Sequence, residues 1–190
     1  MDRIVSHLLT RRSVSARYLA GPGPSPAEIE TILTAAARVP DHGKLVPWRF
    51  VVIQGEAGKR LGEIAAELAR QKQDMTDAER LAVEQTRFTR APLVIAVVSN
   101  AVEHPKIPVW EQQLSAGAAC LNLLSAASAL GYGACWLTEW MAYDADFAHA
   151  LGLKGEERIA GFIHIGTTQQ QPTERARPAL EDIVTYWRAD

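Results

Sequence analysis

The sequence predicts an α+β fold, or a three-layer arrangement of helices around a small central sheet, in a single domain that spans residues 1–190. Short apolar runs typical of buried strands alternate with longer segments of helical periodicity. One helical segment, residues 109–130, is apolar on every side, which places it at the centre of the fold or between two subunits. No repeat, low-complexity segment or interdomain linker divides the chain.

The first third of the chain begins with two expected helices. Residues 2–11 are predicted to form the first, and an irregular stretch rich in glycine and proline follows over residues 13–24. Ser25-Pro26-Ala27-Glu28 combines a capping box with a proline at the first helical position, which is a specific start signal. This second helix must end near Val39, because Pro40 disfavours helical backbone in the residue before it.

The middle of the chain is predicted to contain two buried strands, Phe50–Gln54 and Leu93–Ser99, because both segments are almost entirely apolar. An amphipathic helix over residues 56–70 follows the first strand. Residues 71–90 are charged and carry few large apolar groups. We interpret them as a solvated helix or a mobile excursion, with a lid over a pocket as the alternative.

The last third is expected to continue the alternation of helices and strands. After the long helix of small residues, the predicted elements are a strand over 134–138, a helix over 144–151, a strand over 159–165, an extended tail over 166–178 and a terminal strand over 183–187. The apolar tail contains Tyr186 and Trp187 and must pack somewhere. Pairing with the sheet edge of a second subunit would bury this tail. The alternative is a monomer in which other parts of the same chain cover it.

Composition and charge argue against several classes of protein. Apolar residues make up 47% of the chain and the formal net charge is −2, without the basic stripe of a nucleic-acid-binding module. Cys120 and Cys135 are too few for a disulfide scaffold and predict buried free thiols in a reducing compartment. Residues 112–138 carry no charge, but their glutamines, serines and glycines favour a buried helix, turn and strand over a membrane span. With no visible secretory signal, we expect a cytoplasmic protein that binds neither membrane nor nucleic acid.

Common catalytic signatures are missing from the sequence. It has no Gly-x-Gly-x-x-Gly turn, no P-loop and no Gly-x-Ser-x-Gly elbow. Its five histidines show no metal-ligand spacing with acids or cysteines. We therefore expect no metal and no essential catalytic side chain, and we expect an organic cofactor to supply the reactivity.

Two small arginine groups stand at opposite ends of this nearly neutral chain. Arg11-Arg12-Ser13 lies near the N-terminus, and Arg175 and Arg177 lie near the C-terminus. The planar guanidinium group donates two hydrogen bonds to one phosphate, so the pattern favours a phosphate-bearing ligand. The alternative is that the first group complements a helix dipole and the second consists of surface charges.

Further motifs lie between the two arginine groups and occur in a fixed order with them. In chain order the motifs are Arg-Arg-Ser after the first helix, Arg38-Val39-Pro40-Asp41-His42, Pro47-Trp48-Arg49-Phe50, Trp110-Glu111-Gln112, Gly131-Tyr132-Gly133-Ala134-Cys135-Trp136, residues 159–166, and the Arg-x-Arg-Pro tail. Each motif is modest alone, but their joint order is specific and covers about residues 3–187. In this order the sequence resembles the nitroreductase family of flavoproteins, and most of all its short YdjA-type branch.

The resemblance implies a homodimer that binds two FMN molecules non-covalently at the subunit interface. It also implies a three-layer α/β/α fold whose mostly antiparallel sheet is completed by the C-terminal strand of the partner. The residues that match the family's cofactor positions are Arg11, Arg12 and Ser13 at the phosphate and ribityl chain, Arg175 and Arg177 in the tail, Arg38 and His42 reaching the partner's flavin, and Trp136, Leu137 and Thr138 along the flavin ring. A backbone N–H, that of Thr138, would meet flavin N5.

The sequence departs from the wider family before the first strand. Many members carry Asn-x-Gln-Pro-Trp there, whereas this chain has Lys44-Leu45-Val46-Pro47-Trp48. Side-chain amides that could hold the flavin pyrimidine are therefore absent. Lys44 could replace one of them, because a cation near N1 and O2 would stabilise the reduced anionic flavin.

The function implied by the resemblance is an FMN-dependent NAD(P)H oxidoreductase. It would reduce nitroaromatics, quinones or similar electron-poor small molecules by ping-pong hydride transfer through flavin N5. One alternative is an FMN-binding protein that handles or stores flavin without NAD(P)H turnover. Another is a non-enzymatic α+β dimer whose arginines bind a different phosphate ligand.

Overall fold

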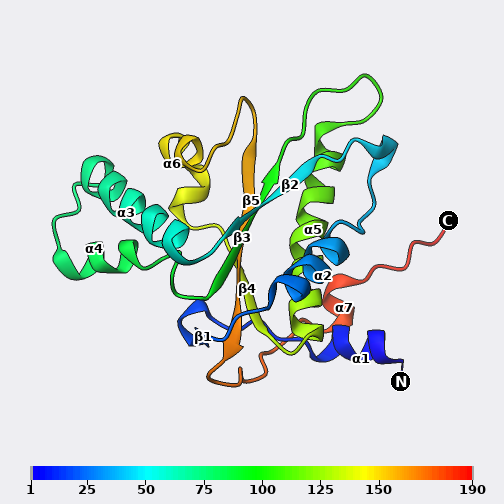
Figure 1. The fold of residues 1–190 in the computed structure, drawn as a ribbon. Coiled ribbons are helices and arrows are strands. Elements are labelled where there is room, and N and C mark those ends of the chain that lie inside the picture. Colours follow the sequence, from blue (N-terminus) through cyan, green and yellow to red (C-terminus); the bar gives the residue numbers. More distant parts are fainter. Residues whose placement is uncertain (1, 190) are drawn as a thin grey trace.

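The computed structural model describes residues 2–189 and contains a five-stranded sheet between two layers of helices (Figure 1). The strand order is β1-β5-β3-β2, β4 pairs with β5, and every pairing is antiparallel. The expected α+β fold with three layers and an antiparallel sheet is confirmed. The strands are β1 (Leu19–Ala20), β2 (Trp48–Ile53), β3 (Leu93–Ser99), β4 (Gly133–Leu137) and β5 (Arg158–Thr168). The helices are α1 (Arg3–Thr10), α2 (Pro26–Ala36), α3 (Gly55–Lys72), α4 (Ala78–Gln85), α5 (Val109–Ala129), α6 (Ala145–Ala150) and α7 (Leu180–Ile183), with 3-10 turns η1 (Ala16–Tyr18), η2 (His42–Lys44) and η3 (Trp140–Tyr143).

The core lies on both faces of the central strand β3, all of whose residues are buried. Because side chains alternate along a strand, Leu93, Ile95 and Val97 face one layer, which contains α2 and α5. Val94 and Ala96 face the other layer, which contains α3 and α6. The apolar run of β3 is thus explained by helices on both faces of the sheet.

The predicted long helix is present as α5, and its two faces differ. Its buried side chains, mostly small, pack against the sheet and α2 and are Gln112, Ser115, Ala116, Ala119, Cys120, Leu123, Leu124 and Ala127. Trp110, Leu114 and Leu121 are instead 66%, 53% and 46% exposed. An exposed row of large apolar side chains on a central helix is typical of a surface that another chain covers.

Residues 71–90 include a helix whose side chains are mostly exposed, which agrees with the expected solvated helix, but this helix is packed on α3. They contain α4, which packs against α3 and buries Leu81. The two helices approach so closely that a Cβ on Gly62 would lie 1.9 Å from the carbonyl oxygen of Gln85. Met75 and Phe88 are buried on either side of α4. Few large apolar side chains are needed here, because glycine and alanine allow the helices to touch.

Three strand predictions need correction. The stretch expected to be irregular contains β1, whose two residues pair with Thr167 and Thr168 of β5 and are too few for periodicity to reveal. The strand predicted as buried, β2, is a half-buried edge strand, because it pairs only with β3. The predicted terminal strand over 183–187 is unpaired within the chain: α7 ends at Ile183, and Tyr186 and Trp187 are 83% and 85% exposed.

A buried histidine on β5 makes the stability of the fold depend on pH. His164 is 2% exposed, and its Nδ1 has no hydrogen-bond partner. Burial, and secondly the charge of Arg90, lower the pKa of His164 from 6.5 to about 4. The unfolded chain therefore takes up a proton at a higher pH than the folded chain does. Stability is full above about pH 6.5 and falls as the pH drops toward about 4.

We expect His164→Leu to flatten this pH dependence. Between pH 7 and pH 4, the wild-type chain should lose roughly 3 kcal/mol of unfolding free energy more than the variant does. Urea titrations at a series of pH values measure the difference. His149→Leu is the matched control, since His149 is exposed on α6 and its replacement should leave the wild-type profile in place. Parallel profiles for wild type and His164→Leu would contradict the assignment.

Candidate functional site

A groove of about 1100 Å³ opens where β4 ends. Single-ligand pockets are usually about 300–1,000 Å³, so the groove can hold an extended molecule. It is bounded by the segment after α1, by the end of α4 and by the last residues of β4. The lining residues are Ser13, Ser15, Ala16, Arg17, Val83, Thr86, Arg90, Leu124, Cys135, Trp136, Leu137, Thr138 and Glu139.

The segment after α1 presents its serines to this groove because its other side chains are buried. The N–H of Val14 donates to the carbonyl of Ala134 at 2.9 Å, which ties the segment to β4. Val14 and Ala16 are 5% and 3% exposed. Ser13 and Ser15, which alternate with them, line the groove. The predicted site residue Ser13 is therefore at the groove.

Three arginines gather beside Ser13. Arg12 forms an ion pair with Glu174 at 3.1 Å and also donates to the carbonyl of Thr173, and Arg177 lies 3.7 Å from the same Glu174 carboxylate. Burial, then the charges of Arg177 and Arg12, lower the pKa of Arg11. Within residues 2–189, Arg11 has no carboxylate at salt-bridge distance. Two of the three cations thus share one carboxylate and Arg11 has none, so the cluster has an excess of positive charge.

The two tail arginines differ in their relation to this cluster. Arg177 pairs with Glu174 and acts on Arg11. Arg175 contributes its backbone N–H to the Glu174 carboxylate at 2.9 Å, and among the described residues its side chain makes no ion pair of the cluster. The structure therefore brings Arg11, Arg12, Ser13 and Arg177 together and leaves the Arg175 side chain exposed.

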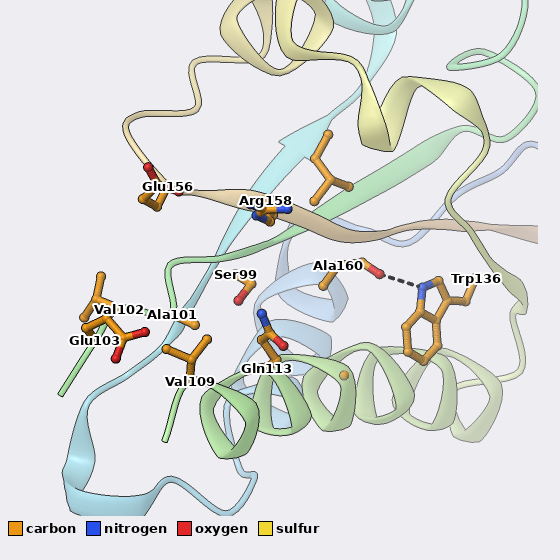
Figure 2. Close-up of a pocket in the computed structure, with 12 residues that line it drawn as sticks. Ser99, Ala101, Val102, Glu103, Val109, Gln113, Trp136, Glu156, Arg158 and Ala160 are labelled. Atoms are coloured by element: carbon orange, nitrogen blue, oxygen red, sulfur yellow. Dashed lines mark hydrogen bonds between the residues drawn. The ribbon is translucent and has the colours of Figure 1, made fainter. Parts of the chain in front are cut away.

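The predicted ring-binding residues Trp136, Leu137 and Thr138 all line the groove. The indole of Trp136 is 39% exposed and donates from Nε1 to the carbonyl of Ala160 at 3.1 Å (Figure 2). The ring lies flat on β5, because a Cβ on Gly161 would come 1.9 Å from Nε1. Trp136 is thus a fixed wall of the site rather than a fully buried core residue.

Trp136 also separates the groove from a second pocket of about 760 Å³. Figure 2 shows this pocket between the N-terminal half of α5, the start of β5 and the loop after β3. Ser99, Gln113 and Arg158 provide polar groups around an apolar floor that includes Ala160.

Arg38 and His42 do not line the groove of their own chain. Both are exposed, in the segment between α2 and β2, and α2 itself lies on the other side of the sheet from α4 (Figure 1). His42 Nδ1 lies 2.7 Å from the Glu111 carboxylate in the first turn of α5. Lys44 is also exposed, in η2, and does not line the groove. A role for these residues at a flavin therefore requires a second subunit and stays a prediction.

Sequence reasoning missed an ionic network beside the groove, which reaches the groove through Arg90 and Glu139. Glu84 is 4% exposed and accepts two hydrogen bonds from Arg87, each 2.5 Å, and one from Trp140 Nε1 at 3.0 Å. Burial would raise the pKa of Glu84, but the bonds from Arg87 and Trp140 lower it. Arg87 also binds Glu139, and Arg90 lies 3.5 Å from Glu139. The charge run at 84–90 was the available signal, but its partner at 139 is distant in sequence.

Two further features of the groove bear on chemistry. Arg17, which sequence reasoning did not single out, lines the groove with its guanidinium 4.7 Å from the Tyr18 ring centroid. Cys135 and Cys120 are free and buried, as predicted. Burial raises the pKa of the Cys135 thiol to about 11, so it is neutral and a poor nucleophile. The groove thus offers binding groups rather than an activated nucleophile.

Comparison with known proteins identifies the family. The nitroreductase family model matches residues 8–167, which is most of the chain. The chain belongs to the nitroreductase family. It is 34% identical over 183 residues to the Escherichia coli K12 protein YdjA, provisionally named an NAD(P)H nitroreductase, covering 95% of this chain and 97% of YdjA. The resemblance to the short YdjA-type branch of the nitroreductases is confirmed.

Solved nitroreductase structures share the same fold. A nitroreductase-like protein from Bacillus cereus superposes with a TM-score of 0.86 at 24% identity, covering 100% of this chain and 98% of that one. A protein from Desulfovibrio desulfuricans, provisionally named a nitroreductase and solved in complex with FMN, superposes with a TM-score of 0.74 at 24% identity and 98% coverage of both chains. Within residues 2–189 of this nitroreductase, no helix is long and apolar enough to cross a lipid bilayer.

Proposed function

We propose that this nitroreductase binds FMN non-covalently and uses it to transfer electrons from NAD(P)H to nitroaromatics, quinones or similar electron-poor small molecules. The observation that carries the proposal is the arginine cluster, defined as Arg11, Arg12 and Arg177 with the single acid Glu174, beside the groove. Excess positive charge next to an open groove favours a dianionic group such as a phosphate monoester. The FMN-bound relative and the naming of YdjA support the same assignment.

The residues present fit an FMN-shaped ligand. The cluster and Ser13 would hold the phosphate through charge-assisted hydrogen bonds. Leu124, Trp136 and Leu137 line the groove and suit a flat apolar ring. Arg90 and Glu139 also line it and suit a polar ring edge. The groove and the adjoining cluster thus offer groups for each part of FMN, namely its phosphate, its apolar ring face and its polar ring edge.

The chain contributes binding and orientation rather than bond-making side chains. FMN, when bound, supplies the redox chemistry by accepting hydride from NAD(P)H and passing electrons to the acceptor. The fixed ring of Trp136 would limit movement along the groove, and Thr138 would present its backbone to the ring. A donor and an acceptor that share one open site bind in turn, so we expect ping-pong kinetics.

We also propose that the functional unit is a homodimer with FMN at the subunit interface. Large apolar side chains are exposed on α1, on α5 and in the tail, and the outer edge of β2 is unpaired among the described residues. A partner would cover these surfaces and bring its own Arg38 and His42 toward the groove. Val184 follows α7 with extended backbone, residues 185–189 form no helix, and this segment could pair with the free edge of β2.

An anaerobic titration tests the proposed function. We expect FMN-reconstituted protein to lose its visible flavin absorbance with one equivalent of NADH or NADPH and to regain it when a nitroaromatic or quinone is added. Protein that binds FMN but is bleached by neither donor would indicate a flavin-handling role without NAD(P)H turnover. Protein that binds no FMN would overturn the assignment of the groove.

A further inference from the structure

We propose that the Arg87–Glu139 ion pair is a positioning clamp that holds the backbone of Thr138 and Glu139 in the shape it needs to face the cofactor. This inference rests on the proposed FMN site, because Thr138 and Glu139 line that groove. It concerns side chains that the family motifs quoted above do not include. The clamp is defined as Glu139 with Arg87 and Arg90, and Glu84 anchors it from α4.

Glu139 has an unusual backbone conformation for a residue with a side chain. Its φ is 53° and its ψ is −177°, a region populated almost only by glycine. Such a conformation persists only when surrounding contacts enforce it. Glu139 is also the residue before η3 and directly follows Thr138, so its φ and ψ set the orientation of the backbone where β4 meets the groove.

The contacts that enforce this conformation are ionic and largely buried. The side chains of Arg87 and Glu139 are 16% and 23% exposed, so water screens their attraction weakly. Arg87 is itself fixed by two hydrogen bonds to Glu84, whose side chain is 5% exposed. Arg90 adds a second cation 3.5 Å from the Glu139 carboxylate. The carboxylate is therefore held by two arginines of the segment after α4, one of which is fixed by Glu84 of α4.

The position of the clamp connects it to binding rather than to stability alone. If Glu139 were released, its backbone would relax toward negative φ, where side-chain-bearing residues are stable. That change would rotate the peptide between Thr138 and Glu139 and re-aim the N–H groups beside the groove. Glycine at position 139 would adopt the same φ without any clamp. The clamp thus allows a glutamate to occupy a position whose backbone favours glycine.

A series of substitutions at position 139 tests this role. We expect Glu139→Ala to weaken FMN binding about tenfold or more, since it removes the clamp and keeps a Cβ. Glu139→Gly should stay within about threefold of wild type, although it removes the same ion pair. Glu139→Gln should lie between them, because its amide oxygen still accepts from Arg87. Equal losses in Glu139→Ala and Glu139→Gly would overturn the proposal and assign the effect to the charge itself.

A second measurement keeps this test separate from the proposed function. In FMN-free protein, amide hydrogen exchange of residues 137–143 should be faster in Glu139→Ala than in wild type and close to wild type in Glu139→Gln. Arg60→Ala, which breaks the exposed Arg60–Glu63 pair on α3, should not change it. If wild-type protein binds no FMN but the variants show these differences in exchange, the proposed function is refuted and the clamp is still supported. Unchanged exchange in Glu139→Ala would refute the clamp whether or not FMN binds.

Discussion

Replacing Arg11 and Arg12 together by alanine is expected to weaken FMN binding by roughly 100- to 10,000-fold while leaving riboflavin binding within about threefold. Riboflavin has the same ring and ribityl chain as FMN but lacks the phosphate. Each arginine can donate charge-assisted hydrogen bonds to that phosphate, and each such interaction contributes about 1.5–3 kcal/mol. The loss should therefore be confined to the ligand that carries the anion. Fluorescence titrations with the two flavins measure both affinities on the same protein.

The tail offers a matched control for this prediction. Arg177 belongs to the arginine cluster, whereas the side chain of Arg175 makes none of its ion pairs among the described residues. We expect Arg177→Ala to weaken FMN selectively, and we expect Arg175→Ala to leave its affinity nearly unchanged. Equal weakening of FMN and riboflavin by the double substitution would instead indicate that the arginines support the groove's shape. A strong selective loss of FMN affinity in Arg175→Ala would indicate that the phosphate binds outside the cluster.

The elements that the sequence predicts well are those defined by local physics. The second helix begins where its capping box and proline place it, because Ser25 and Glu28 satisfy each other's backbone donors within four residues. The central strand β3 is continuous in apolar residues because helices cover both of its faces. The edge position of β2 could not be predicted from its sequence, since pairing with only one neighbour is a property of the whole sheet.

The features of the candidate site also fall into those that are local in the sequence and those that depend on the whole fold. The arginines at both ends of the chain were recognisable because each group is a local motif. The pairing of Arg87 with Glu139 joins residues 52 positions apart, and neither residue type predicts it. The preference of position 139 for positive φ was equally invisible, because a glutamate there gives no sign of a glycine-like backbone. Both features depend on how α4 packs beside the end of β4.

Ending the chain after Pro178 is expected to convert a dimer into a monomer. The deletion removes a tail whose large side chains are 42–85% exposed in the single chain, namely Leu180, Ile183, Val184, Tyr186 and Trp187. Burying each such side chain contributes roughly 1.5–3 kcal/mol, so losing even three of them should raise the dimer dissociation constant about 1,000-fold or more. Sedimentation velocity over a range of concentrations measures this shift. The truncation keeps Arg177, so the arginine cluster itself remains.

FMN affinity of the truncated chain connects assembly to the site. If the partner contributes Arg38 and His42 to each groove, FMN binding should weaken together with dimerisation and recover as protein concentration rises. Tyr143→Ser is a suitable control, because Tyr143 is 79% exposed but lies in η3, outside the α1, α5 and tail surfaces. It should change neither assembly nor affinity. A truncated chain that remains dimeric would show that the interface does not depend on the tail and would favour α1 and α5, which also carry exposed apolar residues. If the truncated monomer binds FMN as tightly as the full chain does, the partner contributes nothing to FMN binding.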